Sequence, residues 1–381
     1  MNIKGSRTEF LTGLQKVISA TQSGNIHPIL SNVLLKATGN NVELIAGDQE
    51  TQIKAPCGVV ANKKFDATVS AKKFQDILRR LDTDAEVMFD YQEKDEKKED
   101  SAPSISISCG KARYKLSALN PDEFPLMGKK LKFESLLKLP ASEMLRCLKR
   151  VVYSSAVNSH RLNLNGVLLE GSASGLRVVA TDGHRMAVQP LSQGKSPGEV
   201  QLILPLKSVN ELVRNLPAEG DSEIEILTTD AKSENQIVRF IAASFELTST
   251  IITDSFPDYA SVIPRNNDKT VGIVRKDLLD GLQRVGAVGD REPTVVMNLD
   301  KNKVFLECTN QDNDVGTDEV AVKYSGEKME IGFNLEYLIE MLTAVEEDGF
   351  EIKILDASSS VLVVPAEKKK DFQYIIMPVR L

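Results

Sequence analysis

The chain has 381 residues, of which 41% are hydrophobic, and its 47 basic and 54 acidic side chains leave a formal net charge of -7. The length allows two to four domains, each with its own core, and the absence of an apolar run approaching ~20 residues excludes a helical membrane span. The charge balance does not indicate a nucleic-acid-binding protein, although a polyanion responds to a local basic surface rather than to net charge.

The amino-terminal segment 1–7 lacks the apolar stretch of a signal peptide, so we expect a cytoplasmic protein. The four cysteines are widely spaced and form no CxxC pair, which favours free thiols over a disulfide or metal site. They are Cys57, Cys109, Cys147 and Cys308. Neither His27 nor His160 has a partner at a metal-binding spacing. We therefore expect neither a metal nor a cofactor.

Three amphipathic helices are predicted at 9–18, 143–152 and 277–286, starting about 134 residues apart. Each begins with an acidic residue, followed by apolar residues in the spacing i, i+1, i+4 and i+7. Three more helices are predicted later in each repeat, at 70–81, 205–216 and 334–342. Ser70 and Asn334 stand where an N-cap is expected, and Pro205 suits a first helical turn. The recurrence predicts a threefold internal repeat.

Short strands are predicted between these helices, separated by turn residues in the manner of antiparallel meanders. They lie at 33–35, 42–45, 167–169, 176–180, 224–226, 237–241, 294–299, 304–306 and 361–364. A hairpin is predicted where the strand ending at Ala180 meets the strand at 186–188, with Asp182 and Gly183 in the turn. Each repeat therefore contains two units of one helix and several strands, and the fold class is α+β.

The first two repeats end in similar sequences, NPDEFP at 120–125 and TDSFPDY at 253–259. These predict three domains at 1–127, 128–257 and 258–381. The mixed charge run 92–100 is predicted as a solvated hairpin loop.

Basic residues recur on equivalent predicted helices of this acidic chain, which indicates a positive layer. Ordinary solvated helix faces explain the same pattern equally well. The residues of this predicted positive layer are Lys72, Lys73, Arg79, Arg80, Arg146, Lys149, Arg150, Lys207, Arg214 and Arg284.

Four motifs within the threefold repeat resemble those of the bacterial sliding clamps, the β subunits of DNA polymerase III. They are LNG at 164–166, TDGHR at 181–185, FPDY at 256–259 and YIIMPVRL at 374–381. The resemblance covers essentially the whole chain. It implies a DNA clamp fold with antiparallel sheets outside and helices lining a central channel, formed by a head-to-tail homodimer of six domains around duplex DNA.

A ring that slides requires phosphate attraction without base-specific contacts, because a base contact would hold it at one sequence. The resemblance therefore assigns the residues of the positive layer to a DNA-facing layer that lines the channel, with an acidic exterior. The chain has no GxxxxGK[ST] motif, in agreement with the family, where a separate clamp loader hydrolyses ATP. The implied partners are the clamp loader, the replicative polymerase, translesion polymerases and mismatch-repair proteins, each inserting a short Leu/Phe-containing peptide.

The resemblance implies a pocket for this peptide at the junction of the second and third repeats. Its expected residues are Arg161, Leu164, Thr181, Gly183, His184, Arg185, Met186, Pro257, Val262, Ser360, Ile375, Met377, Pro378, Val379, Arg380 and Leu381. Apolar and methionine side chains suit an adaptable wall, although about half of them are equally compatible with an ordinary core.

The implied head-to-tail interface combines opposite charges from the two ends of the chain with apolar residues. We assign to it Lys111, Arg113, Tyr114, Ala287, Val288, Asp312, Asp314, Asp318 and Glu319. Three positions depart from the family pattern. Gly24 stands where some relatives have an Arg facing DNA, and Asn163 and Ser261 stand where some have Tyr and Arg near the pocket rim.

Two alternatives to a clamp compete. His184 is a conceivable general base, with Asp182 to orient it and Ser154, Ser155 or Ser159 as nucleophile. Asp182 and His184 are only two positions apart in one hairpin, however, and no serine lies in a GxSxG elbow, so we expect no enzyme. The other alternative is an adaptor that binds proteins without encircling DNA. A ring stays on circular DNA and leaves linear DNA, whereas an adaptor shows no difference between the two.

Overall fold

The computed structural model describes residues 1–22, 24, 27–93, 102–173, 175–193, 198–229, 236–367 and 372–381. Most of the charged run predicted as a loop at 92–100 lies outside the described residues. The chain comprises two compact units. The first unit comprises Met1–Ser142 with Asn210–Ile251, and the second comprises Glu143–Val209 with Ile252–Leu381.

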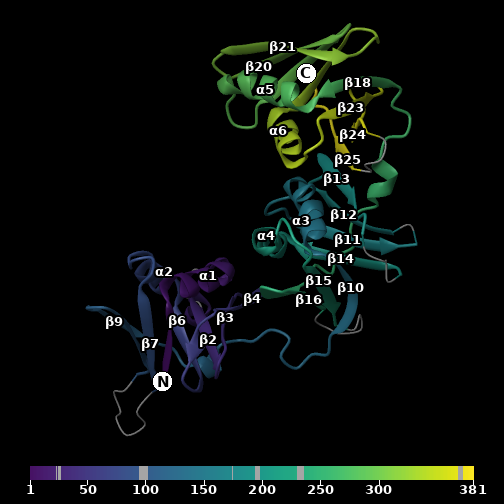
Figure 1. Ribbon diagram of the computed structural model, residues 1–381. Coiled ribbons are helices and arrows are strands. Elements are labelled where there is room, and N and C mark those ends of the chain that lie inside the picture. The colour runs from purple at the N-terminus through teal and green to yellow at the C-terminus, as the bar shows by residue number, and fades with distance from the viewer. Residues whose placement is uncertain are drawn as a thin grey trace. The chain divides into compact units, whose positions relative to one another are not determined.

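The described residues form six repeats of one βαβββ pattern, in which a helix follows directly on a strand and three strands follow the helix (Figure 1). The first repeat is β1 (Asn2–Ser6), α1 (Arg7–Val17), β2 (Asn32–Thr38), β3 (Val42–Gly47) and β4 (Thr51–Pro56). The second is β6 (Lys64–Ser70), α2 (Ala71–Arg79), β7 (Glu86–Gln92), β8 (Ser104–Cys109) and β9 (Ala112–Ser117), and β5 (Val60–Ala61) precedes it.

The third repeat is β10 (Glu134–Pro140), α3 (Ala141–Lys149), β11 (Gly166–Ser172), β12 (Gly175–Thr181) and β13 (Arg185–Pro190). The fourth is β14 (Val200–Pro205), α4 (Leu206–Asn215), β15 (Glu223–Thr228), β16 (Ile237–Ala242) and β17 (Phe245–Thr250). The fifth is β18 (Lys269–Val274), α5 (Arg275–Val285), β19 (Thr294–Asp300), β20 (Lys303–Thr309) and β21 (Val315–Lys323). The sixth is β22 (Met329–Asn334), α6 (Leu335–Ala344), β23 (Gly349–Ile354), β24 (Val361–Pro365) and β25 (Gln373–Ile376).

Short 3-10 helices occupy several connections: η1 (Ile18–Ala20), η2 (Pro28–Ser31), η3 (Pro121–Glu123), η4 (Val152–Ser154), η5 (Leu162–Leu164), η6 (Tyr259–Val262) and η7 (Gly286–Val288).

All six predicted helices are confirmed, and each begins one or two residues from its expected start. The predicted N-caps are also confirmed: the side chain of Ser70 accepts a hydrogen bond from the amide of Lys73, and that of Asn334 accepts one from the amide of Tyr337. The expectation for Pro205 is wrong, because this residue ends β14 and the helix begins at Leu206. As β14 is the terminal strand of its sheet, a proline there removes no ladder hydrogen bond.

The strands form three sheets, and every pairing between named strands is antiparallel, as predicted. The first unit contains the sheet β5-β1-β7-β8-β9 and the sheet β10-β15-β16-β17-β4-β3-β2-β6. The second unit contains the sheet β14-β11-β12-β13-β25-β24-β23-β18-β21-β20-β19-β22. Two pairings join strands of different predicted domains. They are β17 with β4 and β13 with β25, and we call such a pairing a seam.

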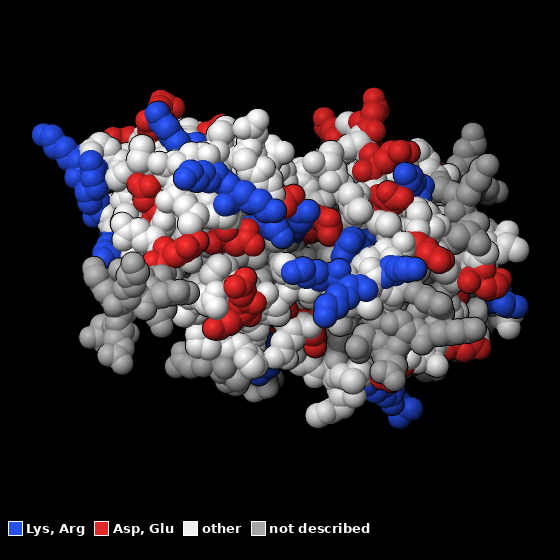
Figure 2. Space-filling model, turned by 90° about the horizontal axis from the view of Figure 1, so that it is seen from below, with Lys and Arg blue, Asp and Glu red and all other residues white. Residues whose placement is uncertain are grey.

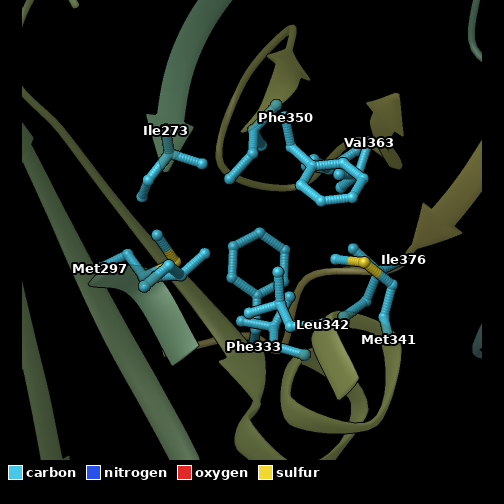
Figure 3. Close-up of a pocket in the computed structure, with 12 residues that line it drawn as sticks. Ile273, Met297, Phe333, Met341, Leu342, Phe350, Val363 and Ile376 are labelled. Carbon is cyan, nitrogen blue, oxygen red and sulfur yellow. The ribbon is translucent and has the colours of Figure 1, made fainter. Parts of the chain in front are cut away.

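Helices pack in pairs against these sheets, α1 with α2 in the first unit and α5 with α6 in the second (Figure 1). Phe10 of α1 and Phe74 of α2 meet edge to face, with ring centroids 5.8 Å apart. In the second unit, Phe333 and Phe350 lie close together among Met297, Met341 and other apolar side chains (Figure 3). The void that these side chains surround is about 10 Å³, too small for more than one water. This cavity is therefore part of the core.

No helix within the described ranges is both long and apolar enough to cross a membrane. The four cysteines are free thiols, three of them buried and Cys109 partly buried.

Candidate functional site

The TDGHR motif forms a tight turn between β12 and β13 that is held by its own side chains. One carboxylate oxygen of Asp182, Oδ1, accepts hydrogen bonds from the amides of His184 (2.8 Å) and Arg185 (2.9 Å). The hydroxyl of Thr181 donates to the carbonyl of Arg185 (2.7 Å) and accepts from the amide of Gly183 (3.1 Å). Gly183 has φ 96°, a conformation that favours glycine. The motif is therefore a preorganised corner.

This geometry does not support His184 as a general base. Asp182 binds backbone amides through Oδ1 and the guanidinium of Arg185 through Oδ2 (3.0 Å), so its carboxylate does not orient the imidazole, and His184 itself is exposed. Of the three candidate serines, Ser154 is fully buried at 0% exposure, and the hydrogen bonds that the structure describes for the other two do not involve His184. Ser155 donates to the carbonyl of Gly166 (3.2 Å), and Ser159 accepts from the amide of Arg161 (3.2 Å).

A cavity of about 230 Å³ opens beside this turn in the second unit. It is lined by twelve of the sixteen residues assigned to the pocket from the sequence: Arg161, Leu164, Thr181, Gly183, His184, Arg185, Met186, Pro257, Val262, Ser360, Ile375 and Met377. They come from the segment 161–164 at η5, the end of β12 with its turn and the start of β13, the segment through η6, the loop before β24, and the end of β25 with the residue after it. The amide of Met377 donates to the carbonyl of His184 (2.9 Å), which fixes the carboxyl-terminal segment against the turn.

The cavity combines a rigid floor with an exposed mouth. Met186 and Ile375 are only 3% and 4% exposed and belong to an apolar cluster with the buried side chains of β11, β12, β14 and β24. At the mouth, Val262 is 57% exposed and Met377 is 49% exposed. Exposed apolar side chains around a hollow mark a binding surface. The buried members of this set therefore belong to the core, and the exposed members border the cavity.

Two lining residues, Asp258 and Tyr259, were missed from the sequence. The hydroxyl of Tyr259 donates to the carboxylate of Glu170 on β11. Burial, together with this hydrogen bond, raises the pKa of Tyr259 to about 12. The FPDY motif contained the signal, but it was interpreted as a domain boundary and only Pro257 was assigned to the wall.

The last four residues do not line the cavity, contrary to their assignment from the sequence. They are Pro378, Val379, Arg380 and Leu381. The amide of Val379 donates to the carbonyl of Gly332 on β22 (2.8 Å). The side chain of Leu381 lies against Gly332, so close that a Cβ on this glycine would be 2.7 Å from it. The tail therefore lies along β22, which has no strand partner on that side among the described residues.

Two of the three residues that depart from the family pattern support local structure. Asn163 donates from its side chain to the carbonyl of Ser255 (2.7 Å), and Ser261 donates to the carbonyl of Asp258 (2.8 Å). Both bonds hold segments that border the cavity. Gly24 has φ 145° and open space around its Cα.

The residues assigned to a DNA-facing layer differ widely in exposure. Five are exposed and form no ion pair within the described ranges: Lys72, Lys73, Arg79, Arg80 and Lys149. Arg214 pairs with Glu211 (3.7 Å), Arg284 with Asp318 (2.6 Å) and the half-buried Arg146 with Glu143 (2.8 Å). Lys207 is half-buried. On the face drawn in Figure 2, basic side chains gather in groups beside acidic ones.

Arg150 corrects the expectation that it faces DNA. It is 4% exposed, and its guanidinium lies 2.8 Å from the carboxylate of Glu347 and 3.3 Å from the side-chain oxygen of Gln189. These groups border a second cavity, of about 430 Å³, at the Pro190 end of β13. The end of α3 packs there against the segment after α6, which takes the charge of Arg150 out of solvent.

The residues assigned to the head-to-tail interface lie on or next to two strand edges. Strand β9 is the terminal strand of its sheet, with Lys111 and Arg113 exposed and Tyr114 half-buried. Strand β21 pairs with β18 only through Lys323 and Val322, so the edge at 315–321 lacks a partner among the described residues. Near it, Ala287, Asp312, Asp314 and Glu319 are exposed, and Val288 and Asp318 are half-buried.

Three models of the DNA polymerase III beta subunit match consecutive parts of the chain: the N-terminal domain at 1–128, the central domain at 138–258 and the C-terminal domain at 260–380. The chain is 32% identical over 378 residues to the beta sliding clamp of Proteus mirabilis, with 98% of each chain covered. It is 30% identical over 387 residues to that of Pseudomonas aeruginosa, covering 100% of both.

Solved structures are also similar over the whole chain. The sliding clamp of Pseudomonas aeruginosa bound to griselimycin has a TM-score of 0.87 at 30% identity, with 100% of both chains covered. The Caulobacter crescentus beta sliding clamp has a TM-score of 0.88 at 27% identity, covering 100% of this chain and 99% of that one.

Proposed function

The chain belongs to the DNA polymerase III beta subunit family and is a DNA sliding clamp, and from this premise we propose that two copies close head to tail into a ring around duplex DNA. The family consists of non-catalytic processivity factors, with DNA and the polymerase as partners. The proposal extends to three domains at 1–127, 128–257 and 258–381 in each copy, in a cytoplasmic protein. The matched ranges of the three family models support these boundaries.

The observation that carries the ring is the pattern of the two seams. Strand β4 ends the first βαβββ repeat and pairs with β17, which ends the fourth. Strand β13 ends the third repeat and pairs with β25, which ends the sixth. In both seams, the last strand of an odd-numbered repeat pairs with the last strand of an even-numbered one. The last strands of the fifth and second repeats, β21 and β9, instead have open edges among the described residues. The same rule pairs β21 of one copy with β9 of the second copy, and a second contact of this kind closes the ring.

The seam between β4 and β17 also supplies a register for this contact. Glu246, the second residue of β17, stands opposite Lys54, the fourth residue of β4, and their charged groups are 3.9 Å apart. By the registers of the hairpins, Arg113 of β9 corresponds to Glu246, and Thr317 of β21 corresponds to Lys54. Equivalent pairing sets Arg113 opposite Thr317 of the second copy, with the carboxylate of Glu319 two residues along the same face of β21. Opposite charges at such a diagonal position set register and partner choice more than strength.

The exposed cations of the helices provide sequence-independent attraction for the phosphates. Lys72, Lys73, Arg79 and Arg80 lie on and just after α2, and Lys149 ends α3. Contacts of this kind weaken steeply with salt, so electrostatic attraction alone does not retain a protein on DNA. Enclosure does, because a closed ring leaves only by opening or by reaching a DNA end.

Retention on circular DNA tests the ring. After loading by a clamp loader and ATP, we expect the protein to stay on a nicked circular duplex at a salt concentration that removes unloaded protein. Linearising the DNA should release it, since a ring runs off the ends. Gel filtration of the complexes, before and after a single restriction cut, measures this. If the protein dissociates equally from circular and linear DNA, the result contradicts enclosure and favours the protein-binding adaptor.

Substitution of two arginines separates the DNA-facing layer from the buried ion pair. The logarithm of the DNA-binding constant falls linearly with the logarithm of the salt concentration. We expect Arg79→Met to reduce the magnitude of this slope by about 1, because one phosphate contact is lost. Arg150→Met should leave that slope unchanged. It should reduce the free energy of unfolding by about 3–5 kcal/mol, because the buried carboxylate of Glu347 loses this cation.

Fluorescence anisotropy over a salt series gives the slopes, and urea unfolding gives the stabilities. A change of slope in Arg150→Met, or none in Arg79→Met, contradicts the assignment.

We further propose that the 230 Å³ cavity binds a short Leu/Phe-containing peptide of the replicative polymerase, the clamp loader, translesion polymerases and mismatch-repair proteins. The support is its apolar floor, its exposed Val262 and Met377, and the preorganised turn beside it. Burial of two apolar anchors contributes roughly 3–6 kcal/mol before ordering costs. Binding of this strength is exchangeable, so several partners can use one site in turn.

A further inference from the structure

Arg185 carries a buried charge in the wall of the peptide cavity. Its side chain is 7% exposed, and burying a guanidinium is costly unless the charge is paired and hydrogen-bonded. Three groups meet that requirement: the carboxylate of Asp182, the backbone carbonyl of Tyr153 and the carboxylate of Glu340. Burial by itself lowers the pKa of Arg185, but the combined effect of Tyr374, Glu340 and Asp182 raises it.

Glu340 differs from the other partners because it comes from α6, 155 positions along the chain. Asp182 belongs to the same turn as Arg185. Tyr337, which lies three positions before Glu340 on one face of α6, places its ring 4.0 Å from the centre of the guanidinium. Helix α6 therefore holds the guanidinium from two sides, although Glu340 does not line the cavity.

The charge of α6 offers a matched control. This helix contains no Lys or Arg, and its charged residues are Glu336 and Glu340. Glu336 is exposed and forms no ion pair within the described ranges, whereas Glu340, with a side chain that is 48% exposed, pairs with Arg185. Glu336→Gln and Glu340→Gln each remove one negative charge from the same helix. Only Glu340→Gln also removes the ion pair with Arg185 in the cavity wall.

We propose that Glu340 is a positioning residue of the peptide site, acting through Arg185, and this inference rests on the proposed peptide-binding function. With Glu340 in place, the guanidinium is fixed between the turn and α6, so the wall is formed before the peptide arrives. Preorganisation of this kind raises affinity by removing an ordering cost from the binding step. Without the carboxylate, Arg185 keeps Asp182 but loses its anchor on α6.

The experiment measures the affinity of a fluorescein-labelled peptide ending in Leu-Phe by anisotropy, with the full-length protein. We expect Glu340→Gln to weaken binding about 5–10-fold, mainly through a faster off-rate, and Glu336→Gln to change it less than twofold. In an Arg185→Met background, Glu340→Gln should have no further effect, because its only route to the peptide has been removed. Thermal unfolding of each variant is recorded alongside.

Wild-type affinity in Glu340→Gln overturns the inference, as does an equal loss in Glu336→Gln or an undiminished loss in the Arg185→Met background. A lower unfolding temperature with unchanged peptide affinity assigns Glu340 a purely structural role and also overturns it. Failure of the wild-type protein to bind the peptide is a separate result, which refutes the proposed peptide site itself.

Discussion

Lys115→Pro should weaken the proposed dimer and reduce its retention on circular DNA. Along β9, successive backbone amides point in turn to β8 and to the open edge of the sheet. The amide of Ala118 donates to Pro103 beside β8, which places the amide of Lys115 at the open edge. Thr250, at the end of β17, donates in the corresponding direction to Glu50 beside β4. Proline removes this donor and places its ring against the incoming strand.

The proposed ring contains two such contacts. An unsatisfied carbonyl at each costs about 1–3 kcal/mol, so the dimer should weaken by about 30-fold or more. Sedimentation velocity over a concentration series measures this directly.

The control is Lys115→Ala, which removes the charge and keeps the amide, and which should remain dimeric at low salt. The monomeric fold should survive in Lys115→Pro, since proline is tolerated on an edge strand whose amide faces solvent. A Lys115→Pro protein that dimerises with wild-type affinity contradicts the pairing of β9 with β21.

Val262→Asp should eliminate peptide binding while leaving the dimer intact. Val262 lies at the mouth of the cavity and is 57% exposed, so the folded protein accommodates a carboxylate in solvent. An apolar anchor that enters the cavity must strip water from this charge. That cost exceeds about 3 kcal/mol, which corresponds to a 100-fold or greater loss of affinity. Titration calorimetry with the Leu-Phe peptide, beside sedimentation of the free protein, provides the measurement.

Leu381→Asp is the matched control. Leu381 is also apolar and exposed, at 64%, but it lies outside the cavity, beside β22. We expect its peptide affinity to stay within about twofold of wild type, because the new charge remains in solvent. Equal losses in the two variants would place the last residue in the binding site and contradict the geometry described above.

The helices and many strands could be predicted because their signals are local. The apolar stripe of 277–286 indicated α5, and alternation at 224–226 and 237–241 indicated β15 and β16. Strand β1 was missed because Asn2–Ser6 contains a single buried apolar residue, Ile3. The open edges of β9 and β21 could not be predicted from their sequences, since an edge is a property of the strand order.

The site was predicted largely from family motifs, and its errors have a common physical origin. The partners of Arg150 and Arg185 lie far along the chain, at Glu347 and Glu340. No periodicity relates an arginine to a carboxylate more than a hundred residues away, so Arg150 was placed at the surface. The tail was placed in the cavity because the motif is continuous, whereas the bond from Val379 to Gly332 turns the chain away after Met377.

The seams within one chain and the contact proposed between two chains use the same strand pairing, yet they differ in how they reform after breaking. When β4 and β17 separate, the covalent connection keeps them at a high effective concentration, and they pair again whatever the protein concentration. The contact between β21 and β9 of two copies has no such tether. In the proposed ring, two of the six seams lie between copies. We therefore expect the ring to open for DNA at these two seams, and dilution to break them before the four seams within the chains.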